Sequence, residues 1–186
     1  MLRVTEALDV LGIPYLVGGS VASIIHGFVR TTADVDLVVD IRSNQAAPLV
    51  RLLQGEFLIA VEPILQAIRH QRSFQLLHEA SFLRIDIFVS KQRPFDHERF
   101  RRREELTVAR EPTREAWISS AEDTILAKLE WFKIGGETSE RQWRDILGVI
   151  KTQAEALDVG YLRRWAPSLD VDILLERALE EGHKKE

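Results

Sequence analysis

The sequence predicts an α+β fold, in which helices flank a mixed β-sheet and a helical segment follows at the C-terminal end. Two apolar runs, at residues 34–40 and 82–89, alternate with a period of two, as half-buried strands do. After residue 118 the apolar spacing becomes helical. At 186 residues the chain is long enough to bury a core. We therefore expect a core domain over residues 1–118 and a helical region over residues 119–186.

The first elements follow from apolar spacing and glycine positions. Residues 2–11 carry apolar side chains at helical intervals, which predicts a helix. The apolar run 15–17 predicts a buried strand, and the chain turns at 18–20. Ser20 is expected to cap a short helix over 21–26.

The middle of the chain alternates strands with helices. A strand is expected over 34–40, and the runs 73–78 and 82–89 are expected to pair as an antiparallel hairpin. The charged stretch 96–105 is interpreted as a surface segment. The other expected elements are helices over 43–54 and 62–70 and short strands over 106–109 and 115–118.

The C-terminal part is predicted to be all helical. Ser120 and Asp123 have the spacing of a capping box before an apolar-periodic segment, which ends at Gly135-Gly136. Three further helices are expected over 139–153, 158–166 and 170–181.

Composition excludes several classes of protein. The chain has no cysteine, so disulfide scaffolds, zinc–thiolate sites and cysteine nucleophiles are excluded. The net charge is −4, and the acidic excess lies in the C-terminal part, unlike a strongly basic nucleic-acid binder. No apolar run approaches a membrane span of about 20 residues, and the N-terminus lacks the pattern of a signal peptide. We expect a soluble, cytoplasmic protein that does not contact a membrane.

Aspartates mark one face of the expected strand over 34–40. Because strand side chains alternate, Asp34, Asp36 and Asp40 share a face. The strand over 82–89 repeats the pattern, with Asp86 on its polar face. If the two strands are neighbours, Asp34, Asp36 and Asp86 form a cluster of carboxylates. Hard oxygen donors of this kind predict a Mg²⁺ site.

A glycine turn precedes these strands. Gly18, Gly19 and Ser20 lie between an expected strand and a helix N-terminus. Glycines let a phosphate approach the backbone, and the free N–H groups of a helix start attract an anion. A glycine turn together with metal-binding carboxylates is typical of sites for phosphoryl or nucleotidyl transfer.

These motifs resemble the nucleotidyltransferase superfamily, which shares the polymerase-beta-type fold. The resemblance rests on Leu16-Val-Gly-Gly-Ser20, Asp34-Val-Asp-Leu-Val38 and Leu83-Arg-Ile-Asp86-Ile. The pattern His26-Gly27-x-x-Arg30-x-Thr32-x-Asp34-x-Asp36 is most similar to the bacterial branch that includes the AbiEii-type toxins. The motif Ala121-Glu-Asp123-x-x-x-x-Lys128, followed by Arg141-x-x-x-Asp145, resembles the helical motif of that branch.

The resemblance implies a metal-dependent active site. Asp34 and Asp36 would hold two Mg²⁺ ions, and Asp86 would share one of them and orient or deprotonate the acceptor hydroxyl. The triphosphate of an NTP, with ATP expected, would lie on Gly18, Gly19 and Ser20. Arg30 and Lys128 would supply positive charge to the phosphates.

Structural interpretations remain open for several of these residues. Asp40 could cap the helix that follows it, and Lys128 could lie on a solvated surface. Arg141 and Asp145 could form an i, i+4 ion pair. The arginines between 99 and 103 are interpreted as a solvated face.

The leading hypothesis is transfer of NMP, with AMP expected, to a hydroxyl of a macromolecule such as tRNA or a protein. By the resemblance, the chain could be the toxin of a toxin–antitoxin pair, with an antitoxin as its partner. An alternative is a small-molecule adenylyltransferase of the aminoglycoside or lincosamide type. A third alternative is a binding module that kept the fold without turnover.

Overall fold

The structure is a computed structural model that describes residues 1–27, 31–32 and 34–183. It divides into two compact units. The first comprises Met1–Gly18 and Thr32–Ile118, and the second comprises Gly19–Thr31 and Ser119–Glu186. The segment after Gly18 therefore groups with the C-terminal helices, although it lies between two strands of the first unit in sequence.

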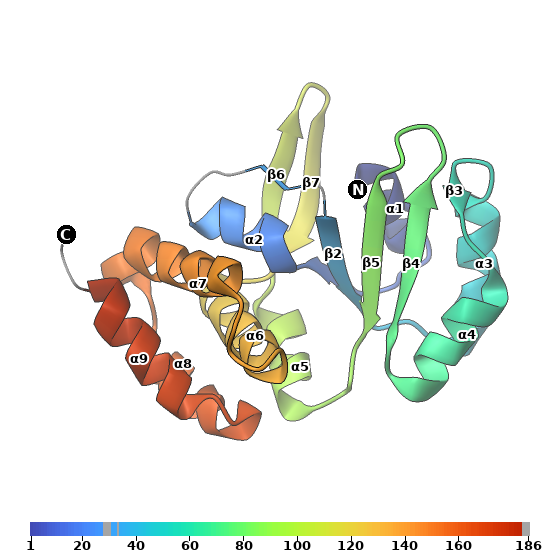
Figure 1. Cartoon of the computed structure of the whole chain (residues 1–186). Coiled ribbons are helices and arrows are strands. Elements are labelled where there is room, and N and C mark those ends of the chain that lie inside the picture. The colour runs from blue at the N-terminus through green and yellow to red at the C-terminus, as the bar shows by residue number, and fades with distance from the viewer. Residues whose placement is uncertain (28–30, 33, 184–186) are drawn as a thin grey trace. The chain divides into compact units, whose positions relative to one another are not determined.

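The first unit is built on a seven-stranded mixed sheet in the order β3-β4-β5-β2-β1-β7-β6 (Figure 1). The pairs β2–β5 and β1–β7 are parallel, and the other neighbouring pairs are antiparallel. This confirms the predicted α+β class. The strands are β1 Tyr15–Val17, β2 Asp34–Val39, β3 Phe57–Leu58, β4 Ser73–His78, β5 Arg84–Val89, β6 Glu104–Arg110 and β7 Thr113–Ile118.

Strands β2 and β5 lie side by side, as the carboxylate hypothesis requires. In both strands, buried positions alternate with half-buried or exposed ones. Their buried side chains are aliphatic: Val35, Leu37, Val39, Ile85, Ile87 and Val89. Burial of this face fixes the register, since a slip by one residue would move every apolar side chain to the polar face. The predicted antiparallel pairing of β4 with β5 is also confirmed.

In the described part of the first unit there are four helices. The helices α1 Leu2–Val10, α3 Ser43–Leu53 and α4 Val61–His70 match expected helices, and α1 packs on α3, α3 on α4, and α4 on β4 and β5. The fourth, α5 Pro94–Arg102, is a helix that was not predicted, because this stretch was interpreted only as a charged surface segment. Pro94 stands at the helix start, where it is tolerated, and Asp96 accepts hydrogen bonds from the backbone N–H and the guanidinium of Arg93. Phe95, Asp96 and Arg99 are buried.

The second unit is helical. It contains α2 Gly19–His26, α6 Ala121–Ile134, α7 Glu140–Gln153, α8 Val159–Trp165 and α9 Asp172–His183, with short 3₁₀ turns at Ala154–Ala156 and Ala166–Leu169. The predicted cap of α6 is present, because Ser120 Oγ accepts a hydrogen bond from the Asp123 N–H at 3.2 Å. Helix α2 packs on α6 and α7, and His26 Nε2 lies 2.7 Å from the Ser119 carbonyl oxygen.

Close packing joins α7 and α9. A Cβ atom added to Gly182 would lie 2.5 Å from Ile150 Cγ2, so only glycine allows these helices to approach as they do. Within the described part of the chain, no helix combines the length and apolar character needed to cross a membrane.

Candidate active site

The candidate site is the polar face of strands β2 and β5 in the first unit. The parallel register places Asp36 beside Asp86 and Asp34 beside Arg84. All four residues have the strand parity opposite to the buried aliphatic side chains. The structure therefore brings the three predicted carboxylates onto one face of two hydrogen-bonded strands.

Two further side chains, which were not among the predicted site residues, contact these carboxylates. Gln75, on β4 and paired with Asp86, donates a hydrogen bond from Nε2 to Asp86 Oδ1 at 2.6 Å. Arg84 Nη2 lies 3.5 Å from Asp34 Oδ1, and its Nε lies 4.0 Å from Asp86 Oδ2. The predicted hairpin already placed Gln75 on the strand next to that of Asp86. A polar side chain between two apolar neighbours on that strand could have marked Gln75 as a candidate site residue.

The side-chain oxygens of Asp86 have different surroundings. Oδ1 is fixed by Gln75, whereas Oδ2 lies beyond hydrogen-bond distance of Arg84 Nε. The Asp86 side chain is 20% exposed and that of Asp34 is 39% exposed. The carboxylates of Asp34 and Asp86 are thus partly shielded from water but still accessible to a ligand.

Gly18 adjoins this face through the backbone. Its N–H donates to the Asp36 carbonyl oxygen at 2.9 Å, extending the pairing of β1 with β2. Gly18 is the last residue of its segment in the first unit. The start of the glycine turn is therefore tied to the strand that carries Asp34 and Asp36.

Gly19 and Ser20 belong to the second unit, where they form the first turn of α2. The expectation that Ser20 caps this helix is wrong, since the helix begins at Gly19 and Ser20 lies inside it. Gly19 has φ +52°, a backbone conformation that glycine adopts without strain. Ser20 is buried.

Lys128 lies in the second unit and is buried, which contradicts its interpretation as a solvated lysine. Its Nζ lies 2.9 Å from Asp145 Oδ2, and the two side chains are only 10% and 4% exposed. Asp145 thus pairs across α6 and α7, whereas Arg141, its suggested partner within the helix, is exposed. Arg30, the other expected phosphate ligand, lies outside the described residues.

Asp40 was considered as a cap for the helix that follows it, but it does not cap α3. The N-cap position is Arg42, and Asp40 Oδ1 accepts a hydrogen bond from Gln92 Nε2 at 2.8 Å. The expectation of a solvated face for residues 99–103 is also wrong for Arg99, which is buried.

The donor chemistry of the site fits a hard cation. Carboxylate oxygens are the ligands that Mg²⁺ takes from proteins, and three are available on one sheet face. Over the residues the structure describes, however, no three His, Asp or Glu side chains are already gathered as a metal-holding group. Arg84 lies close to two of the three predicted ligands instead.

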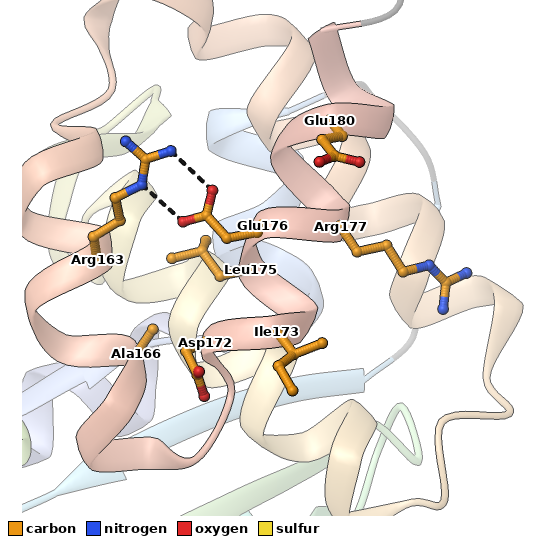
Figure 2. A pocket seen from close by; sticks show the side chains of 8 residues that line it. All are labelled: Arg163, Ala166, Asp172, Ile173, Leu175, Glu176, Arg177 and Glu180. Atoms are coloured by element: carbon orange, nitrogen blue, oxygen red, sulfur yellow. Dashed lines mark hydrogen bonds and ion pairs between the residues drawn. The ribbon is translucent and has the colours of Figure 1, made fainter.

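The second unit also contains an open pocket between the 3₁₀ turn at 166–169, α8 and α9 (Figure 2). Arg163 forms two hydrogen bonds with Glu176 across it, at 2.7 and 2.8 Å. Hydrogen bonding to Arg163 lowers the pKa of Glu176. None of the sequence-predicted site residues lines this pocket. Of its charged lining residues, Arg163 pairs with Glu176 and Arg177 pairs with Glu181. We assign no function to this pocket.

The fold is similar to that of solved nucleotidyltransferase structures. An antigenic nucleotidyltransferase-like protein from Paracoccidioides brasiliensis aligns over 96% of this chain and 90% of its own, with a TM-score of 0.56 and 19% identity. The antibiotic-resistance factor ANT(2'')-Ia in solution aligns over 94% of this chain and 93% of its own, with a TM-score of 0.53 and 15% identity. The same factor in complex with adenylyl-2''-tobramycin aligns over 89% of this chain and 94% of its own, with a TM-score of 0.51 and 16% identity.

No family model matches the sequence, and no curated protein does so either. The similarity is therefore one of structure, with low sequence identity across nearly the whole chain. The chain has a nucleotidyltransferase-like fold.

Proposed function

We propose that this protein is a nucleotidyltransferase that moves NMP from an NTP to a hydroxyl group. The observation that carries the proposal is the placement of Asp34, Asp36 and Asp86 on one face of the parallel pair β2–β5. That placement occurs within a nucleotidyltransferase-like fold. Neither feature alone would support an activity, since a fold hosts many functions and strands often carry paired polar residues.

Asp34, Asp36 and Asp86 would hold the metal, for which we propose two Mg²⁺ ions. When bound, such ions would neutralise the negative charge that develops on the phosphates. The acceptor oxygen forms a bond to the α-phosphorus, the bond from that phosphorus to the bridging oxygen breaks, and pyrophosphate leaves. Asp86 Oδ2, left without a hydrogen bond from Arg84, is the oxygen suited to take the proton of the hydroxyl.

The triphosphate is assigned to the glycine turn. Gly19 and Ser20 would contact it through their backbone N–H groups and the Ser20 hydroxyl. The N–H of Gly18 is hydrogen-bonded to the Asp36 carbonyl oxygen, so Gly18 would contribute by letting the phosphate approach its backbone closely. Arg30 and Lys128 would add positive charge. Because Asp145 lies 2.9 Å from Lys128 and offsets its charge, we expect Arg30 to contribute more.

A small-molecule acceptor has one specific observation in its favour. The tobramycin complex of ANT(2'')-Ia is among the structures similar to this chain, and it holds an adenylylated antibiotic. We therefore propose ATP as the donor and a polyhydroxylated small molecule as one candidate acceptor. Transfer to tRNA or protein, with a toxin role and an antitoxin partner, is the second candidate and rests on the sequence pattern around Asp34 and Asp36.

The test is transfer of label from each α-³²P NTP with Mg²⁺. Aminoglycosides, lincosamides, a tRNA pool and the protein itself serve as acceptors. Asp36→Asn and Asp86→Asn should stop label transfer while the variants stay folded. Asp40→Asn is the matched control, because Asp40 follows the same strand but pairs with Gln92.

The acceptor that gains label identifies the substrate class. Label on a small molecule would support the adenylyltransferase of that class, and label on RNA or protein would support the macromolecular one. If NTP binds but neither label transfer nor pyrophosphate release occurs with any acceptor, the chain is a binding module and the proposal is wrong.

A further inference from the structure

We propose that Arg84 is a built-in counterion of the carboxylate site, which a divalent cation must displace when it binds. The inference rests on the proposed function, because it assumes that Asp34 and Asp86 are metal ligands. It goes beyond that function by assigning a role to a residue outside the predicted ligand set.

The geometry puts the guanidinium between two carboxylates. Arg84 stands beside Asp34 in the register of β2 and β5, and two residues before Asp86 on the same face of β5. Its Nη2 lies 3.5 Å from Asp34 Oδ1 and its Nε 4.0 Å from Asp86 Oδ2. One side chain thus contacts a carboxylate on each strand.

Without a counterion, these carboxylates would repel one another. Asp36 and Asp86 are direct neighbours across the two strands, and Asp34 is one position along the same face. Like charges at such spacing destabilise a sheet. A cation from the chain itself relieves this repulsion until another cation arrives.

The contacts of Arg84 are weak enough to exchange. The Arg84 side chain is 54% exposed, and neither contact is short. Exposed ion pairs of this kind contribute little to stability, because water competes for both partners. A divalent cation offers the carboxylates more charge at shorter range, so the guanidinium can leave for solvent at little cost.

Gln75 keeps one ligand in place during this exchange. It holds Asp86 Oδ1 from β4 at 2.6 Å, independently of Arg84. When Arg84 moves away, Asp86 therefore stays oriented. The site has one fixed neutral partner and one exchangeable charged partner.

The experiment measures binding of Mn²⁺ alone, by the electron paramagnetic resonance signal of the free ion, without nucleotide or turnover. Arg84→Gln removes the competing charge and should bind Mn²⁺ about two- to fivefold more tightly than wild type. Arg84→Lys keeps a cation at the site and should stay close to wild type. Arg51→Gln, at an exposed arginine of α3 in the same unit, controls for the general loss of positive charge and should also match wild type.

Each outcome bears on a different part of the argument. The inference is supported if Arg84→Gln binds Mn²⁺ more tightly than wild type and the two control variants do not. This holds also if binding by the wild type is too weak to measure. Equal or weaker binding by Arg84→Gln, or equal tightening in Arg84→Lys or Arg51→Gln, overturns it and leaves the proposed function standing. If neither wild type nor Arg84→Gln binds Mn²⁺, the metal-dependent proposed function fails and this inference fails with it.

Discussion

Asp36 on β2 and Asp86 on β5 are direct partners in the register of two parallel strands. They lie far apart in sequence, and only the insertion of β5 beside β2 brings them together. The parallel register of β2 and β5 places the two side chains on one face at the same level. The pair is the centre of the candidate active site.

This pairing predicts a nucleotide-dependent gain in stability. Wild type with Mg²⁺ and ATP at 100 times the dissociation constant should gain about 2.7 kcal/mol, which is roughly 5–10 °C in the unfolding midpoint for a chain of this size. Asp36→Asn should lose the shift, because a neutral amide does not replace the charge of a carboxylate ligand. Differential scanning fluorimetry with each NTP, with and without Mg²⁺, measures both. A shift of full size in Asp36→Asn would contradict the metal assignment.

Gln75 predicts a second effect on the same site. Its hydrogen bond holds Asp86 Oδ1, and partners that orient metal ligands typically change metal affinity or activity 10- to 100-fold when removed. We expect Gln75→Leu to lower Mn²⁺ affinity about tenfold with little loss of stability, because Gln75 is exposed. Gln92→Leu, which breaks the equivalent bond to Asp40, is the control. Equal losses in both variants would mean that the effect is not specific to the site.

The alternation of β2 and β5 made the carboxylate face predictable from sequence. Val35, Leu37 and Ile85 show period two strongly enough to fix which side chains share a face. The contact of Gln75 with Asp86 was not predictable, because it depends on the register of β4, which spacing alone does not give.

Two errors have local physical causes. Ser20 has the right residue type for an N-cap, but the helix begins at Gly19, so Ser20 lies in the first turn instead of at the cap position. Most residues of α5 are charged, so the segment shows no clear apolar periodicity. Phe95 is the large apolar residue of this helix that is fully buried. Segments with few apolar residues give weak periodicity even where they fold.

The burial of Lys128 depends on how α6 packs on α7, which a sequence pattern does not specify.

The buried ion pair of Lys128 with Asp145 predicts a non-additive effect on stability. Lys128→Met leaves Asp145 buried and charged without this partner, and should lower the free energy of unfolding by about 3–5 kcal/mol. The double variant Lys128→Met/Asp145→Leu replaces both charges with apolar groups and should recover most of that loss. Urea unfolding of the wild type, both single variants and the double variant forms a double-mutant cycle that measures the coupling free energy between Lys128 and Asp145. Additive losses would show that the two side chains do not stabilise each other.

Tyr15 on β1 predicts a loss of stability at alkaline pH. Burial, then the nearby charge of Asp9, raises the pKa of its hydroxyl to about 12 in the folded protein, compared with 10 for an ordinary tyrosine. Because the folded-state pKa is the higher one, this contribution is complete below pH 10 and is lost as the pH rises from about 10 to 12. Tyr15→Phe cannot ionise, so its unfolding free energy should fall less over that range. Urea unfolding at several pH values measures the free energy of unfolding, and the 295 nm absorbance of the tyrosinate measures the ionisation of the tyrosine.

Tyr161→Phe is the matched control, since that hydroxyl donates to Asp123 in the helical unit and its loss should leave the Tyr15 titration unchanged. If the Tyr15 hydroxyl of the wild type titrated near pH 10, the fold would not be holding it in its neutral form.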